Sequence, residues 1–249
     1  MSFKLEICSF DITSALIAQS AGAHRIELCA APAEGGTTPG PGTILAARER
    51  LHIDLYPIIR PRGGDFLYTD EEYDTMVKEV LFCRQVGCNG VVIGLLHKDG
   101  TVDKTRSARL VELAYPMGVT FHRAFDRAIN PFEALEDIIS IGCERILTSG
   151  QRPVAPEGAT LINDLVRQAD DRIIIMPGAG VRADNIHHLA EKTDASEFHT
   201  SARIDVPSAM EFVNETMKDD QTTVRPDRKE IEKIIGILAS LETKMSDPR

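Results

Sequence analysis

The chain has 249 residues, of which 43% are hydrophobic and 27% are charged, and its formal net charge is −10. This length can bury a large core without stabilisation by disulfides or metals. The negative charge argues against a nucleic-acid or anionic-membrane partner, because both require a basic face. A small anion pocket is compatible with it, since such a pocket needs only a few local donors.

The cysteines and the N-terminus indicate the cellular compartment. There are five cysteines, an odd number without a ladder-like spacing, and this favours free thiols in a reducing environment. The opening residues, MSFKLEICSF, lack the charged and apolar regions of a signal peptide. No apolar run reaches the roughly 18 residues of a membrane-spanning helix. We therefore expect a cytoplasmic protein.

Short apolar, β-branched runs alternate along the chain with longer amphipathic stretches. Strands that alternate with helices predict a parallel sheet, and eight such units close into a (β/α)8 barrel, the TIM-barrel architecture. We predict one domain over residues 1–249, with a six-stranded open sheet as the alternative. The eight expected strands cover residues 4–8, 25–29, 54–59, 90–95, 119–122, 145–148, 172–176 and 196–200.

Helix boundaries are marked by capping residues. Thr69 followed by Glu72 predicts a capping box, and Asn130 before a proline predicts another helix start. Asp227 and Glu230 are expected to cap the last helix. Two stretches, 32–42 and 203–226, are irregular, and the part near 214–226 is expected to be mobile.

Polar and glycine-rich segments follow the expected strands, whereas the turns from helix to strand are plain. EGGTTPGPG follows the second strand and RPRGGDF the third, and the fifth to eighth end in HRAFD, TSG, PGAG and HTSAR. In a (β/α)8 barrel the C-terminal ends of the strands carry the functional residues. The sequence therefore predicts a site at this end of the barrel.

Several charged side chains are expected to face the barrel axis. Successive side chains alternate between the faces of a strand, so Glu6 shares a face with Cys8. On the second strand Arg25, Glu27 and Cys29 share a face. Because the intervening apolar residues should pack against the helices, these charged residues should point inward. The same parity directs three more polar side chains inward: Arg60, His122 and His199.

Buried charges are costly unless they are paired, so glutamates that face arginines predict a network. Its functional interpretation is an active site at which Glu6, Glu27 or His122 moves a proton. The alternative is an ion lattice that fixes the geometry of the barrel and does no chemistry.

Cys8 and Cys29 end matching segments, EIC and ELC, on adjacent expected strands. Neighbouring strands lie about 4.8 Å apart. Two inward thiols at this spacing can ligate a soft ion such as Cu(I). The alternative is that both act as small buried hydrophobic residues.

Two further clusters favour anion binding or acid–base chemistry. Gly178 and Gly180 precede a helix expected near Arg182, and backbone N–H groups at such a helix start can bind an anion. The alternative is that the two glycines only form a tight turn. His122 and Asp126 share one loop and suit acid–base catalysis. The residues expected to bind substrate are Arg25, Arg60, Arg62, Arg123, Ser149, Gly178, Gly180, His199 and Ser201.

These segments resemble the CutC family, named for copper homeostasis. The resemblance covers roughly residues 3–203, and RPRGGDF and TFHRAFD are its most specific parts. The matching segments are LEIC, RIELC, EGGTTP, IRPRGGDFLY, VTFHRAFD, RILTSGQ, PGAGV and EFHTSAR.

The resemblance implies a (β/α)8 barrel in the cytoplasm, a role in copper handling, and a homo-oligomer, commonly a dimer or larger. It also implies copper binding by Cys8 and Cys29. The chain departs from the family after Arg203, where AMEFVNETMKDDQTTV replaces the usual glycine- and serine-rich segment. Any contribution of that last loop to the site is therefore open.

Two functions remain from the sequence. The first is copper binding or trafficking through Cys8 and Cys29. The second is an isomerase, lyase or aldolase that acts on a small anionic or phosphorylated metabolite. Its anion would be held by Arg60, Arg62, Arg123 and the glycine turn.

Overall fold

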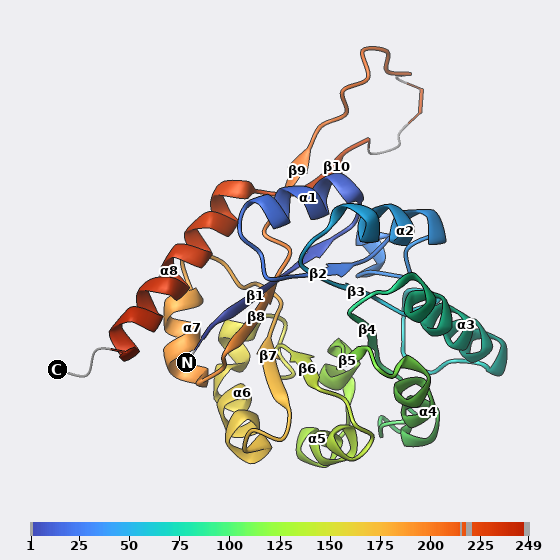
Figure 1. Cartoon of the computed structure of the whole chain (residues 1–249), viewed down its shortest axis with the longest axis vertical. Helices are drawn as coiled ribbons and strands as arrows, with labels where there is room; N and C mark the ends of the chain where they lie inside the picture. Colours follow the sequence, from blue (N-terminus) through green and yellow to red (C-terminus); the bar gives the residue numbers. More distant parts are fainter. Residues whose placement is uncertain (1, 215, 218–220, 247–249) are drawn as a thin grey trace.

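Strands and helices alternate along the chain in this computed structural model, which describes residues 2–214, 216–217 and 221–246. Figure 1 shows the strands at the centre and the helices outside them. The eight central strands are β1 (Lys4–Ser9), β2 (Arg25–Leu28), β3 (Asp54–Pro57), β4 (Gly90–Ile93), β5 (Gly118–Phe121), β6 (Arg145–Thr148), β7 (Ile174–Pro177) and β8 (Glu197–Thr200).

The helices follow the strands in turn, and two short 3-10 helices lie between strand and helix. The α-helices are α1 (Ile12–Ser20), α2 (Pro41–Arg50), α3 (Asp70–Val86), α4 (Lys104–Ala114), α5 (Pro131–Ser140), α6 (Ala155–Ala169), α7 (Ile186–Thr193) and α8 (Arg228–Ser246). The 3-10 helices are η1 (Pro32–Glu34) and η2 (Arg123–Arg127).

The central strands are parallel and form two four-stranded sheets, ordered β3-β2-β1-β8 and β4-β5-β6-β7. A parallel bridge from Ile58 to Val92 joins the sheets beyond the end of β3. At the other seam β7 lies beside β8, but no ladder joins them among the described residues. The predicted α/β barrel class is confirmed, and the six-stranded alternative is wrong.

The strand boundaries differ from the sequence expectation by up to two residues. β6 matches, whereas β3 ends at Pro57 and β7 begins at Ile174. Pro57 has no backbone N–H, so the ladder is weakened there. Arg172 lies in a turn instead, where its N–H donates to the Ala169 carbonyl at 2.9 Å.

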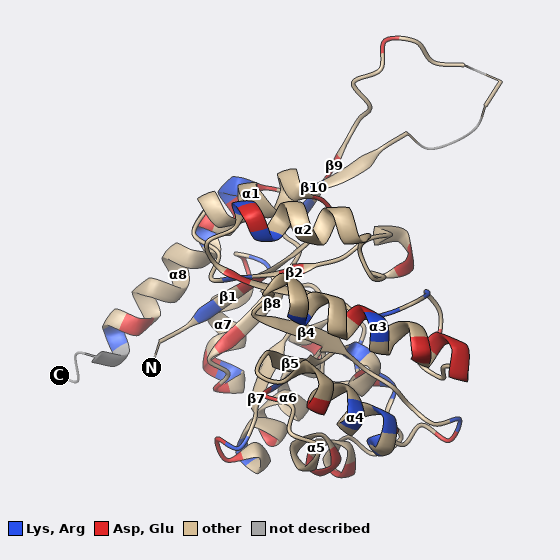
Figure 2. Cartoon of the chain, turned by 45° about the vertical axis from the view of Figure 1, so that its right-hand side comes forward, with Lys and Arg blue, Asp and Glu red and all other residues tan. Residues whose placement is uncertain are grey.

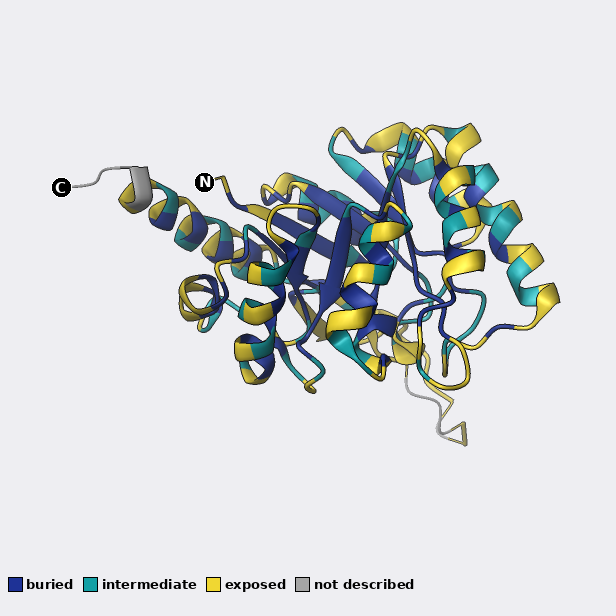
Figure 3. Ribbon diagram, turned by 90° about the horizontal axis from the view of Figure 1, so that it is seen from below, coloured by how far each residue is buried: buried dark blue, intermediate teal, exposed yellow. Residues whose placement is uncertain are grey.

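The apolar core lies between the strands and the surrounding helices. Leu5, Ile7, Ile26 and Leu28 are fully buried, as the parity of β1 and β2 predicts. Figure 3 shows buried strands inside helices whose outer faces are exposed. In Figure 2, charges of both signs are interspersed over the outer helices. No helix in the described residues has the length and apolar character needed to cross a bilayer.

Most capping predictions are confirmed. Thr69 and Glu72 form the expected capping box of α3, and Asn130 accepts hydrogen bonds at the start of α5. Asp227 accepts from the N–H of Lys229 at 2.9 Å. Glu230 was expected to cap α8 and instead accepts from the N–H of Ala183 at 2.9 Å, because its side chain reaches the turn before α7.

A hairpin interrupts the predicted irregular segment after β8. β9 (Arg203–Val206) pairs antiparallel with β10 (Thr223–Pro226), and Figure 1 shows this arm projecting from the barrel. The segment near 214–226 that was predicted to be mobile lies partly outside the described residues. The exposed apolar side chains of the arm are Ile204, Met210, Phe212, Val213 and Met217.

Candidate functional site

A network of paired charges fills the lower interior of the barrel. The register of β1 and β2 places Glu6 beside Arg25, and the two form a salt bridge. Arg25 also pairs with Glu197 at 2.7 Å. Arg145 contacts Glu197 at 2.7 Å and Glu144 at 2.8 Å. Except for the half-exposed Glu144, these side chains are buried, so each charge depends on its partners.

Tyr56 packs between the two arginines of this network. Its ring centroid lies 5.2 Å from Cζ of Arg25 and 5.8 Å from Cζ of Arg145, and its hydroxyl donates to Glu144 at 2.7 Å. Burial and the Glu144 carboxylate raise the pKa of Tyr56. Sequence parity predicts the network. Arg145, Tyr56 and Glu197 are not among the residues expected from the sequence, although their positions on β6, β3 and β8 give the same inward signal.

His199 connects this network to the upper part of the barrel. It lies beside Glu6 in the register of β1 and β8, and its Nδ1 is 2.7 Å from Glu6 Oε1. Its Nε2 is 3.7 Å from Glu27 Oε2. Burial opposes the charge, but the Glu27 carboxylate and hydrogen bonds with Cys8 and Glu6 raise the pKa of His199 well above its usual value.

The two glutamates beside His199 differ in protonation. Burial opposes the ionisation of Glu6, but Arg25 and His199 hold its pKa well below the usual range. Burial and the neighbouring Cys8 raise the pKa of Glu27 well above its usual value. Glu6 is therefore a carboxylate that orients His199, whereas Glu27 binds a proton more readily than Glu6 does.

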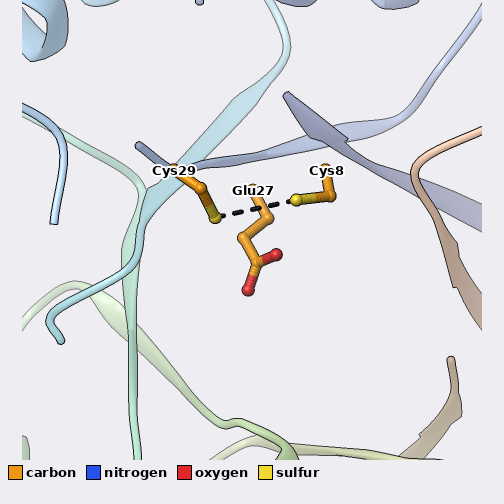
Figure 4. A group of neighbouring side chains, drawn as sticks. All are labelled: Cys8, Glu27 and Cys29. Atoms are coloured by element: carbon orange, nitrogen blue, oxygen red, sulfur yellow. Dashed lines mark hydrogen bonds between the residues drawn. The ribbon is translucent and has the colours of Figure 1, made fainter. Parts of the chain in front are cut away.

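Cys8 and Cys29 form a thiol pair above this network. Their Sγ atoms are 3.6 Å apart, and together with a Glu27 oxygen all three ligand atoms lie within 4.8 Å of one another. Figure 4 shows the three side chains converging from β1 and the end of β2. The hydrogen bond from Cys29 and the contact with His199 lower the pKa of Cys8 to about 5. Burial and the adjacent Cys8 raise the pKa of Cys29.

This donor set suits a soft metal ion. Thiolate sulfur selects ions such as Cu(I) or Zn²⁺, and the neighbouring carboxylate can complete a three-coordinate site. A metal–sulfur bond of roughly 2.3 Å allows two sulfurs on one metal to lie nearly 4 Å apart. The observed 3.6 Å separation is close to this, so small side-chain rotations suffice for a shared ion.

Cys8 of the thiol pair borders a cavity at the C-terminal ends of the strands, whereas Cys29 is buried behind it. The cavity has a volume of about 450 Å³, and Cys8, Glu27 and His199 line its floor. Arg123, Arg182 and Arg203 carry positive charge on its lining. The lining also includes Ile58, Arg60, Phe66, His122, Leu147, Gly180 and Ser201.

Arg60 and His122 lie on the same cavity and are both buried, as parity predicts. Arg60 donates from Nη1 to the carbonyls of Glu34 and Gly36, each at 2.8 Å. Burial and the charge of Arg60 lower the pKa of His122 to about 3. His122 is therefore a neutral imidazole at physiological pH.

Asp126 and Ser149 are held in a closed cluster beside the cavity. Asp126 accepts hydrogen bonds from Arg123 at 2.7 Å and from the Ser149 hydroxyl at 2.9 Å. It also accepts from the hydroxyl of Thr148 and from the N–H of Gln151. These donors occupy both carboxylate oxygens, so in this conformation Asp126 fastens η2 to the end of β6.

The remaining predicted binding residues divide into two groups. Gly180 and Ser201 line the cavity, whereas Gly178 lies behind Leu147, where an added Cβ would be 2.4 Å from Leu147 Cδ1. Arg62 is not among the lining residues; it pairs with Glu72 at 2.6 Å and holds its own loop. Arg25 and Glu6 lie in the network beneath the cavity floor.

The helix expected near Arg182 begins only at Ile186. The N–H of Arg182 donates to the Asn185 side chain at 3.0 Å and closes a turn before the helix. The N–H of Ala183 is taken by Glu230. These two donors are therefore satisfied by the protein itself, and the expected helix start near Arg182 is wrong.

Eight parallel strands, their outer helices and a polar cavity at the C-terminal strand ends define an α/β-barrel protein of the TIM-barrel type. The fold agrees with phosphoribosylanthranilate isomerase of Thermotoga maritima, with a TM-score of 0.60 over 96% of this chain and 100% of that chain. The sequence identity is 13%, so this likeness concerns the fold alone.

The chain belongs to the CutC family, whose model matches residues 3–204. A family protein CutC from Chromobacterium violaceum is 54% identical over 208 residues, which is 84% of each chain. One from Parabacteroides distasonis is 48% identical over 239 residues, covering 93% of this chain and 98% of its own. The resemblance inferred from sequence motifs is thereby confirmed.

A solved structure extends the family match to three dimensions. The structure of a CutC protein from Streptococcus agalactiae, named for a suggested role in copper homeostasis, has a TM-score of 0.77 and 30% identity. It covers 80% of this chain and 98% of that chain. The family match ends at residue 204, inside β9, so most of the projecting arm lies beyond it.

Proposed function

We propose that this protein binds Cu(I) as cargo between Cys8 and Cys29 and thereby takes part in intracellular copper handling. The observation that carries the proposal is the 3.6 Å separation of the two sulfurs beside Glu27, with Cys8 and Glu27 on the lining of a cavity. The name of the Streptococcus agalactiae relative points to the same role.

The residues around the pair support such binding. Cys8 has a pKa of about 5 and offers a thiolate at neutral pH, which is the form that ligates metals. Cys29 would lose its proton when the ion binds, because metal binding deprotonates thiol ligands. The positive charge favoured on His199 stabilises the negative charge that accumulates on the sulfurs.

Anaerobic Cu(I) competition against a calibrated chelator tests the proposal. We expect one tight site in the wild-type protein and its loss in the Cys8→Ser/Cys29→Ser variant. Glu27→Gln should weaken binding less than the double change, because both sulfurs remain. Weak wild-type binding, or equally tight binding in the double variant, would show that this pair is not the copper site.

Cys143→Ala is the matched control for the loss of a thiol. Cys143 is buried, and burial raises its pKa. It is not a member of the Cys8, Glu27 and Cys29 group. Copper affinity should therefore be unchanged in this variant, and circular dichroism on every variant separates the loss of a ligand from unfolding.

The second candidate function is catalysis on a small anionic metabolite in the same cavity. It is favoured by Arg123, Arg182 and Arg203, which place positive charge on the cavity lining. In this proposal Glu27 or His122 contacts the reacting group, and Glu6 positions His199. Substrate-dependent turnover that survives Cys29→Ser but is lost in Glu27→Gln would support it.

We also propose a cytoplasmic, homo-oligomeric protein, as the family resemblance implies. All five cysteines are free thiols, which suits a reducing compartment. Phe212 and Met210 on the arm are 74% and 66% exposed, and such apolar exposure favours a protein contact. Light scattering at several protein concentrations measures the assembly state, and a monomer throughout would contradict the oligomer.

A further inference from the structure

Arg60 is a buried cation without a carboxylate partner among the described residues. It is 6% exposed, and its Nη atoms donate to the carbonyls of Glu34, Gly36 and Gly64, while the uncharged Tyr68 hydroxyl lies close to the guanidinium. Its Nε–H is buried and has no hydrogen-bond partner. Buried charges in proteins are normally paired, so an anion beside Arg60 would be favoured.

His122 supplies a second unpartnered donor on the same cavity. It is 4% exposed, and its Nδ1 accepts a hydrogen bond from the N–H of Ala124 at 3.1 Å. The ring hydrogen of the neutral imidazole therefore resides on Nε2. The Nε2 atom is also buried and without a partner. Like Arg60, His122 presents an N–H that nothing in the described protein accepts.

One aromatic ring connects these two side chains. Cζ of Arg60 lies 5.1 Å from the Phe66 ring centroid, and the His122 and Phe66 centroids are 5.0 Å apart. All three side chains line the 450 Å³ cavity. Ile58 and Leu147 add apolar surface to the same lining. A ligand with a charged head and a small apolar body matches this combination.

We propose that Arg60 and His122 form a subsite for the carboxylate of a small organic acid. One cation without a carboxylate partner matches one negative charge, and the two unpartnered N–H groups match the two oxygens of a carboxylate. Both nitrogens are buried, so small side-chain movements accompany binding. The ligand body lies against Ile58 and Leu147, on the way to the thiol pair. The inference deepens the second candidate function, on which it rests, by naming the group that its substrate carries.

Isothermal titration with propionate, propionamide and inorganic phosphate tests the subsite. We expect saturable binding of propionate, at least tenfold weaker binding of the uncharged propionamide, and weaker binding of phosphate. Absence of saturable propionate binding, or equal affinity for propionamide, would overturn the proposal. Tighter binding of phosphate than of propionate would overturn the assignment to a carboxylate.

Two variants remove the donors separately. His122→Phe keeps a ring against Phe66 but removes the Nε2–H, and Arg60→Lys keeps the charge but removes the guanidinium Nε–H. Each should weaken propionate binding at least tenfold, while Arg109→Lys, at an exposed arginine on α4, should leave it unchanged. Unchanged binding in a folded His122→Phe protein would overturn the role of His122, even where Arg60→Lys does not fold.

Propionate binding can be tested separately from copper binding and from catalysis. Cys8→Ser/Cys29→Ser should retain propionate binding while copper binding is lost, because neither donor is altered. Propionate binding without turnover of any organic acid would leave the subsite standing and the catalytic function unsupported. In ¹⁵N NMR spectra, the His122 Nε2 resonance should shift on adding propionate and stay in place on adding propionamide.

Discussion

The sulfur atoms of Cys8 and Cys29, from adjacent parallel strands, lie 3.6 Å apart, yet the pKa of Cys8 is lowered and that of Cys29 is raised. The asymmetry arises because Cys29 donates a hydrogen bond to Cys8, and because His199 contacts the sulfur of Cys8. The pair therefore holds one thiolate and one thiol, beside the Glu27 carboxyl group, whose pKa is raised by burial and by the charge of Cys8.

Selective alkylation should reveal this asymmetry. Because the pKa of Cys8 is about 5, its thiolate predominates above that pH, and its reactivity should fall only as the pH drops through about 5. Iodoacetamide labelling followed by peptide mass spectrometry measures the rate at each cysteine. Cys8 should react first at pH 6, whereas the buried Cys143 should remain unlabelled in the folded protein. A Cys8 rate that rises only above pH 8 would contradict the assignment.

Much of this site could be predicted from residue parity and from strand order. Alternation along β1 and β2 predicts that Cys8, Glu27 and Cys29 face the same interior, and the structure brings them together. Parity likewise directs Arg60, His122 and His199 toward the cavity. These predictions work because a regular strand leaves only two directions for a side chain.

Residues beyond the strand ends were less predictable. Arg62 follows Arg60 by two residues, but the chain has left the strand there and Arg62 pairs with Glu72. Asp126 is on the expected loop, yet backbone and hydroxyl donors surround its carboxylate. The β9–β10 arm is not predicted, because RIDV and TVRP alternate over only four residues each and are far apart in the sequence. Loop geometry depends on partners distant in sequence, and a local pattern does not contain them.

Glycine at position 90 is required by the ring of Tyr56. A Cβ added to Gly90 would lie 2.0 Å from Tyr56 Cε1, and the ring is held between two buried arginines. Gly90→Ala should therefore lower the free energy of unfolding by roughly 1–3 kcal/mol or more through overpacking. Urea denaturation measures the loss.

Gly236 on α8 provides the matched control for that substitution. Nothing lies within 4 Å of an added Cβ there. Gly236→Ala should raise the free energy of unfolding by about 0.5–1 kcal/mol, because alanine is the better helix former. Equal effects at positions 90 and 236 would show that Tyr56 does not fill the space beside β4.

Arg25 should be among the most sensitive residues of the buried network. Arg25→Met leaves Glu6 and Glu197 in the interior without their shared partner. Breaking a buried pair in this way typically costs about 3–5 kcal/mol of stability. Chemical denaturation of wild-type and variant protein measures the difference.

The surface pair of Arg109 and Glu112 provides the comparison for Arg25. Both side chains are more than half exposed at a contact distance of 2.6 Å. Arg109→Met should change stability by less than about 1 kcal/mol, because exposed pairs contribute little. Similar losses in the two variants would indicate that the inner charges are not mutually dependent.

Acid should destabilise the protein through His122. Its pKa is about 3 in the folded chain and near 6.5 in an unfolded one. Between these values the unfolded state binds an extra proton, so the stabilising contribution is present above pH 6.5 and is lost as the pH falls toward 3. The free energy of unfolding should decrease by up to about 1.4 kcal/mol per pH unit from this residue.

His122→Phe isolates that contribution, because phenylalanine binds no proton and keeps a ring beside Phe66. Urea denaturation of both proteins between pH 4 and pH 7 gives two curves of stability against pH. The wild-type curve should fall more steeply below pH 6.5, and the difference should grow as the pH decreases. Parallel curves would mean that His122 accepts a proton equally well in both states. Its Nε2 would then be solvated, and it would not be the buried, unpaired donor that the carboxylate subsite requires.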